Sequence, residues 1–147
     1  MFDLLFVITA IIFHLLIVGV FIAEKRKHYR LVRWFGTVMI SLAIPLTIVF
    51  IDYLSIGQPL WIMIYLVFIF VYLFVELLLD FLLKIDFRKK LKTHVPYIVL
   101  FYVTSFGFIG ISFYIDVISG YMVSITFWAV LASLIYSYWG RKKKNKE

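Results

Sequence analysis

The sequence predicts an all-α integral membrane protein whose chain crosses the bilayer five times and forms a single transmembrane domain over residues 1–147. Its composition is 65% apolar and 20% aromatic with a mean hydropathy of +1.05, more apolar surface than a soluble core of this length can bury. Its apolar residues form runs of about 20, the length that a helix needs to cross about 30 Å of hydrocarbon. All 15 Lys and Arg residues lie in three short clusters beside these runs.

The first apolar run predicts a helix over about residues 4–23. We expect it to remain as a helix rather than be removed as a signal peptide, because the acidic Asp3 precedes it and its basic residues follow it. The second run predicts a helix over about 34–53 with Pro45 in its interior, closed by the turn sequence SIGQP. Since proline has no backbone N–H to donate, Pro45 is expected to bend this helix.

The third predicted helix, about 60–83, is the longest and leads into the second basic cluster. The fourth, about 95–114, has Pro96 in its first turn, where a missing N–H is tolerated. A turn near Ser119 and Gly120 then leads to the fifth helix. That helix is predicted over about 121–139, and the basic tail 140–147 follows it.

The basic clusters predict which side of the membrane each helix end faces. Lys and Arg concentrate in short cytoplasmic loops, so all three clusters are expected in the cytoplasm. Five crossings satisfy this with the N-terminus outside and the C-terminus inside, whereas four would leave the turn near Ser119 in lipid with unpaired backbone groups. The clusters are Lys25, Arg26, Lys27, Arg30 and Arg33; Lys84, Arg88, Lys89, Lys90 and Lys92; and Arg141, Lys142, Lys143, Lys144 and Lys146.

The same clusters predict a bilayer with anionic headgroups as the main partner. Each basic residue near such a surface contributes about 1 kcal/mol of attraction. The net charge of +7 is therefore explained without nucleic acid. Compact loops favour a multi-pass protein of a bacterial or archaeal cell membrane. The residues expected to contact headgroups are Lys25, Arg26, Lys27, Arg88, Lys89 and Lys90.

An internal repeat is one interpretation of the helix pattern. When His14 is laid over Glu76, Arg26 and Arg88 fall into step, and the second and fourth helices end in FIDYLSIG and YIDVISG. This suggests two helical hairpins of the same orientation followed by a fifth helix, as in transporters built from parallel repeats. The alternative is that apolar helices ending near an Asp resemble one another through composition.

Three ionisable residues lie inside predicted helices: His14, Glu76 and Asp80. Such a side chain costs about 2.5–3.5 kcal/mol at a helix centre, so it usually faces the protein interior. Tyr72, Glu76 and Asp80 are spaced by four residues and form one stripe on a helix. Two carboxylates about 6 Å apart in lipid repel, which favours a shared proton or cation. His14 is expected at a similar depth to Glu76, so a contact between them is geometrically possible.

More ordinary roles for these residues stay open. Asp80 is close enough to the interface to pair with Lys84, and His14 and Glu76 can serve as hydrogen-bonding groups between helices. Three further residues are candidates for lining a cavity beside the third helix: Ser41, Pro45 and Trp128.

These residues favour a small transporter or ligand-binding protein that handles a proton, a cation or a cationic small molecule at Glu76, His14, Asp80 and Tyr72. The alternatives are a non-catalytic subunit or assembly factor with a membrane-protein partner, and a lipid-binding protein with a hydrophobic ligand. An enzyme is less favoured, because the G-x-S-x-G, phosphate-loop and H-E-x-x-H motifs are missing. No cofactor is indicated, and one His with two carboxylates is too weak a signature to predict a metal.

Overall fold

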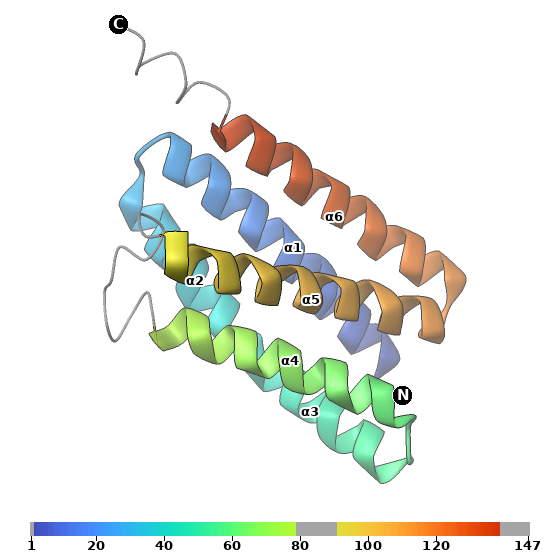
Figure 1. Cartoon of the computed structure of the whole chain (residues 1–147). Coiled ribbons are helices and arrows are strands. Elements are labelled where there is room, and N and C mark those ends of the chain that lie inside the picture. The colour runs from blue at the N-terminus through green and yellow to red at the C-terminus, as the bar shows by residue number, and fades with distance from the viewer. Residues whose placement is uncertain (1, 79–90, 139–147) are drawn as a thin grey trace, which may run out of the picture.

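The computed structural model describes residues 2–78 and 91–138, with side chains for 2–78 and 95–137. This part of the chain is helical and contains no strand. Its helices lie side by side in an elongated bundle (Figure 1). They are α1 (Asp3–Lys25), α2 (Tyr29–Ser41), α3 (Ala43–Ser55), α4 (Leu60–Glu76), α5 (Leu91–Ile115) and α6 (Val117–Tyr138).

The predicted class of protein is confirmed. Among the described residues, four apolar helical segments are long enough to cross a membrane, and α4 is a shorter apolar helix of 17 residues. Because α2 and α3 together form one of the four segments, Tyr29–Ser55, the six helices correspond to about five membrane crossings. The part of the third predicted helix after residue 78 lies outside the described residues.

The two ends of the bundle differ in charge. We call one the basic end, where Lys25, Arg26, Lys27, Arg30 and Arg33 lie around the link between α1 and α2. The other is the acidic end, where Asp3, Asp52 and Asp116 lie at helix termini. The N-terminus is at the acidic end, and α6 ends at the basic end (Figure 1). The charge distribution predicts that the basic end faces the cytoplasm.

The core is formed by one face of each helix, since lipid surrounds the opposite faces. α1 packs along α6 and α2, while α5 packs between α4 and α6. On α5 the buried positions Phe101, Thr104, Phe108 and Ile111 recur every three or four residues, the spacing of one helical face. At the centre Phe13 contacts Phe108, with ring centroids 4.9 Å apart.

Pro45 interrupts the predicted second helix, instead of only bending it. The chain divides at Leu42, where α2 ends and α3 begins. Pro45 lacks the N–H that would bond the carbonyl of Ser41, four residues earlier, and its ring crowds that carbonyl. The Ser41 hydroxyl donates to the carbonyl of Val38 at 2.6 Å, which keeps polar groups paired around the break.

The predicted helix starts were too late. The second crossing begins at Tyr29 instead of residue 34, because the reversal takes only the link through Lys27, whose φ of 59° lies in the left-handed region. α5 begins at Leu91 instead of 95. Hydropathy marks where a chain enters lipid, but a helix continues into the interface as long as its backbone hydrogen bonds are made.

The predicted turn at Ser119 and Gly120 was also misplaced, since the chain reverses at Asp116 and both residues belong to α6. The Asp116 carboxylate accepts hydrogen bonds from the backbone N–H of Ser119 at 3.0 Å and from its hydroxyl at 3.3 Å. This caps the first turn of α6. Gly120 then lets the ring of Phe113 lie against the helix, where a Cβ would be 2.3 Å from that ring.

Candidate functional site

A cavity of about 460 Å³ lies between the helices in the half of the bundle toward the basic end. Residues of α1, α2, α4, α5 and α6 line it. Most of its wall is apolar, with aliphatic side chains such as Ile17 and Val20 and the rings of Phe21 and Phe101. The polar side chains on the wall are Glu24, Tyr72, Glu76, Tyr97, Tyr102 and Ser137.

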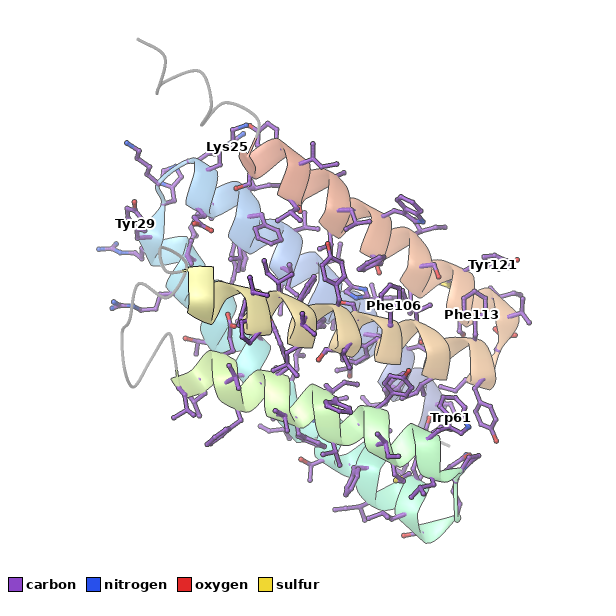
Figure 2. The ribbon with its side chains drawn as sticks, viewed as in Figure 1. Lys25, Tyr29, Trp61, Phe106, Phe113 and Tyr121 are labelled. Atoms are coloured by element: carbon purple, nitrogen blue, oxygen red, sulfur yellow. The ribbon has the colours of Figure 1, made fainter. Side chains whose placement is uncertain are left out.

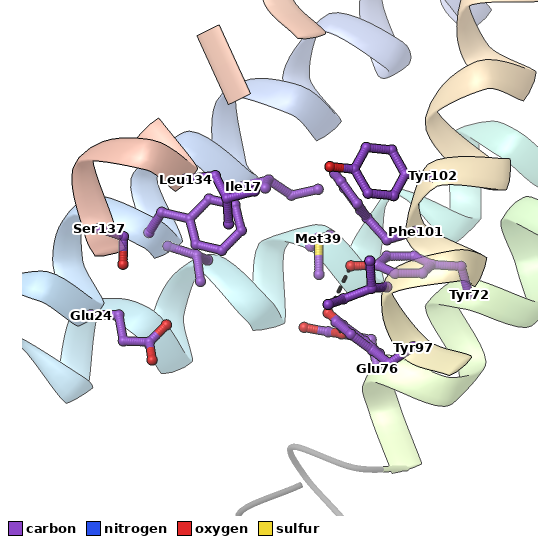
Figure 3. Close-up of a pocket in the computed structure, with 13 residues that line it drawn as sticks. Ile17, Glu24, Met39, Tyr72, Glu76, Tyr97, Phe101, Tyr102, Leu134 and Ser137 are labelled. Carbon is purple, nitrogen blue, oxygen red and sulfur yellow. Dashed lines mark hydrogen bonds between the residues drawn. The ribbon is translucent and has the colours of Figure 1, made fainter. Parts of the chain in front are cut away.

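A hydrogen-bonded chain of three side chains forms one wall of the cavity (Figure 3). The Tyr97 hydroxyl donates to Oε2 of Glu76 at 2.5 Å. The Tyr72 hydroxyl lies 2.9 Å from that of Tyr97. Because Tyr97 uses its single proton on Glu76, Tyr72 is the donor in the second bond. The Glu76 side chain, only 3% exposed, is thereby held on the wall by α5 as well as by its own helix.

A second carboxylate lies on the opposite wall. Figure 3 shows Glu24 of α1 and Ser137 of α6 on one side of the cavity, with Glu76, Tyr72 and Tyr97 on the other. Glu24 and Glu76 each interact with further residues of the chain, so any ligand would join existing contacts rather than meet isolated charges. Two acidic side chains therefore stand on facing walls of the cavity.

Aromatic rings complete the wall on the side of α5. The Tyr72 and Tyr97 rings are 5.6 Å apart, and the Tyr72 and Phe101 rings are 6.0 Å apart. Tyr102 lines the same space one turn further along α5 than Ile98. Ring faces beside carboxylates attract a cation through charge and through the ring quadrupole.

His14 belongs to a different polar pair. It is 0% exposed, and its Nδ1 lies 3.0 Å from the Thr126 hydroxyl oxygen, so it joins α1 to α6. That hydroxyl donates to the carbonyl of Val123 at 2.7 Å, so it accepts from His14. His14 Nε2 is buried without a hydrogen-bond partner among the described residues. Rings of Phe13 and Phe108 stand against it.

The structure brings together some of the residues singled out from the sequence. Glu76 and Tyr72 line the cavity as neighbours on one face of α4. His14 makes its side-chain hydrogen bond to Thr126 rather than to Glu76 and does not line this cavity. Asp80 lies outside the described residues, as do Arg88, Lys89 and Lys90.

None of the three residues expected at a cavity lines this one. Ser41 is exposed at the helix break, Pro45 is half-buried, and neither is on the wall of this cavity. Trp128 is 69% exposed on the outer surface of α6. A helix places only one face toward the core, and the tertiary packing turns the face of Trp128 outward.

The structure describes three of the six residues predicted to contact lipid headgroups: Lys25, Arg26 and Lys27. Arg26 and Lys27 are exposed at the basic end. The Lys25 ammonium lies 3.3 Å from the centre of the Tyr136 ring and donates to the Tyr136 carbonyl at 2.5 Å. Lys25 therefore ties the end of α1 to α6 as well as lying at the basic surface.

Sequence reasoning missed four polar wall residues: Glu24, Tyr97, Tyr102 and Ser137. Glu24 is the one acidic residue directly beside the first basic cluster, and Tyr97 follows Pro96 in the first turns of its helix. These positions were signals, but both residues fit the general pattern of polar and aromatic residues at membrane interfaces. Ser137 has no distinguishing signal in the sequence.

The described part of the chain is thus an all-helical membrane protein with an internal cavity that carries two carboxylates and aromatic rings. Among the described side chains, no three His, Cys, Asp or Glu residues are grouped closely enough to hold a metal ion. Comparison with known protein families, curated proteins and solved structures finds no match to this chain.

Proposed function

We propose that this protein binds a cationic small molecule in the cavity between its helices, as a ligand-binding protein or transporter of the membrane. The observation that carries the proposal is the carboxylate of Glu76, which is held by Tyr97 on the wall of an internal cavity. Buried ionisable residues in membrane helices usually mark a ligand or ion pathway.

The size and lining of the cavity support an organic cation. A volume of about 460 Å³ falls in the range of small-molecule sites, about 300–1,000 Å³. Such sites combine mostly apolar walls with a few polar groups that orient the ligand. Here Glu76 and Glu24 supply negative charge, while Tyr72 and Phe101 supply ring faces for a cation.

Binding is tested with purified protein in lipid nanodiscs and a panel of radiolabelled quaternary ammonium ions, from tetramethylammonium to decyltrimethylammonium. We expect saturable binding of at least one of them. Glu76→Gln keeps the shape of the side chain but removes its charge. It should weaken binding about tenfold or more, the loss of about 1.4 kcal/mol of attraction between the carboxylate and the cation. Asp116→Asn is the matched control, because it removes an acidic charge outside the cavity while asparagine also caps helices.

No saturable binding of any cation to the wild-type protein would refute the proposal. Equal binding by the wild type and Glu76→Gln, with both proteins folded, would refute the role of the carboxylate. Transport is examined separately by cation-flux and pH-gradient assays in proteoliposomes containing the same two proteins at matched incorporation. Flux that Glu76→Gln abolishes would identify a transporter, and binding without flux would identify a ligand-binding protein that does not transport.

A further inference from the structure

The contact between α5 and α6 changes along its length. Near the turn at Asp116 it is closed by rings, with Phe113 and Tyr121 centred 5.4 Å apart, and Gly120 lets Phe113 approach α6 (Figure 2). About two turns closer to the middle of α5, the ring centroids of Phe106 and Phe127 are 5.7 Å apart. These ring contacts connect α5 and α6 at the outer surface of the acidic half, where Phe106 is 56% and Tyr121 61% exposed.

Toward the basic end the two helices spread apart, with α1 behind them (Figure 1). Side chains from both helices face the cavity in this region, Ile98 and Tyr102 from α5 and Leu134 and Ser137 from α6. The Tyr102 ring still contacts Phe127 of α6, with centroids 6.3 Å apart, and the cavity begins beside it. α1, which carries Ile17 and Val20, forms its back wall.

The side chains at this opening belong to both the cavity and the outer surface. Ile98 lines the cavity and is 36% exposed, while Tyr102 and Leu134 line it and are half-buried. Where one side chain contacts both the cavity and the outer surface, only that side chain separates the two. By contrast, Ile17 and Val20 on the back wall are buried. Phe21 and Glu24 of α1, nearer the basic end, are half-buried, and Ile98 of α5 is the most exposed residue of the wall. The cavity therefore comes nearest the lipid-facing surface beside Ile98.

On the basis of the proposed function, we infer that the ligand is an amphipathic amine or quaternary ammonium compound that enters the cavity sideways from the lipid, between α5 and α6. Its cationic head lies against Glu76 and the Tyr72 and Tyr97 rings. Its apolar tail follows the aliphatic wall toward Ile98 and Leu134 and extends between the two helices.

The chemistry of the wall favours an amphipathic ligand over a small hydrophilic cation. A compact cation would contact the carboxylates and rings but would leave most of the apolar wall without a partner. An apolar tail covers that wall, and each methylene removed from water strengthens binding about fourfold relative to the aqueous ligand. Molecules of this kind already concentrate in the bilayer, where the opening between α5 and α6 faces them.

The first experiment compares chain lengths in nanodiscs, counting only the binding that Glu76→Gln removes. We expect decyltrimethylammonium to bind at least a hundredfold more tightly than tetramethylammonium. If tetramethylammonium binds as tightly, the proposed function stands and this inference is refuted. If neither ligand binds, the proposed function fails as well.

The second experiment tests the route of entry. The chain has no cysteine, so Ile98→Cys with Leu134→Cys introduces a unique pair that a bifunctional methanethiosulfonate reagent can bridge and a reducing agent can release. We expect the bridge to slow association of decyltrimethylammonium at least tenfold, and reduction of the same sample to restore the rate. The control pair, Tyr114→Cys with Ile118→Cys, bridges α5 and α6 at the acidic end, where both residues are exposed. If decyltrimethylammonium associates at an unchanged rate while the Ile98→Cys and Leu134→Cys pair is bridged, the inference of lateral entry is refuted.

Discussion

Replacing Tyr97 with phenylalanine removes the group on which the wall of the cavity depends. The Tyr97 hydroxyl donates to Glu76 at 2.5 Å and accepts from Tyr72 at 2.9 Å, so one oxygen connects α4 and α5 twice. Tyr97→Phe breaks both bonds and leaves the buried Glu76 without this donor. Tyr72→Phe breaks only the second bond and leaves the contact between Tyr97 and Glu76 in place.

The two substitutions are therefore expected to differ in cost. A hydrogen bond between membrane helices contributes on average about 0.6 kcal/mol and at most about 1.7. Bonds to charged groups are stronger, about 1.5–3 kcal/mol, although Tyr97 is only partly buried. We expect Tyr97→Phe to lower the free energy of unfolding by about 1–2 kcal/mol and Tyr72→Phe by about 0.5 kcal/mol.

Reversible unfolding in mixed lipid–detergent micelles measures these differences, and a double-mutant cycle with Glu76→Gln isolates the coupling. If the hydrogen bond is present as described, Tyr97→Phe and Glu76→Gln should be non-additive, with a coupling of about 0.5 kcal/mol or more. Tyr72→Phe costing as much as Tyr97→Phe would contradict the two bonds assigned to the Tyr97 hydroxyl. Strict additivity between Tyr97 and Glu76 would contradict the bond itself.

Two further predictions concern helix packing. Gly120→Ala should destabilise the fold by about 1–3 kcal/mol, because the new Cβ would lie 2.3 Å from the Phe113 ring. Gly110→Ala should be neutral or slightly stabilising, because a Cβ at Gly110 would have nothing within 4 Å. Equal effects of the two substitutions in the same unfolding assay would contradict the close contact between Gly120 and Phe113. Thr126→Val removes the acceptor for His14 and should cost about 0.6–1.7 kcal/mol. Measured against a His14→Phe background, the same substitution should cost less, and an unchanged cost would show that the pair is not coupled.

Hydropathy and charge were sufficient to predict the architecture. Lipid cannot satisfy backbone N–H and C=O groups, so each apolar run of sufficient length must become a helix. The bend at Pro45 followed from its missing N–H, which acts locally wherever the residue lies in a helix. The ends of the helices were less accurate, as at Tyr29 and Asp116. These ends depend on single hydrogen bonds and on left-handed residues such as Lys27, which hydropathy does not register.

The site could be predicted only in part. Glu76 was identified because a carboxylate within a membrane helix is energetically costly and usually faces the protein interior. Tyr72 followed from helical spacing. Pairing His14 with Glu76 relied on depth alone, and depth does not specify the direction in which a side chain points. The structure turns His14 toward Thr126 and leaves Trp128 on the lipid-facing surface.

The internal repeat stays a prediction, since similar helix ends also arise from composition alone. The orientation of the bundle likewise rests on the basic residues, among them Lys25, Arg26 and Lys27, rather than on packing. Neither property depends on where the cavity lies.

The sequence by itself determined that this chain is a helical membrane protein, about how many times it crosses, and that Glu76 is the most unusual residue within a crossing. These properties depend on the transfer of each segment from water to lipid, a sum over residues near one another in the chain. Only the tertiary structure decided that Glu76 meets Tyr97, that Glu24 faces it across a cavity, and that α5 and α6 spread apart beside them. Which faces of the helices meet is determined by the packing of side chains from distant segments, and lipid solvates every apolar face almost equally well.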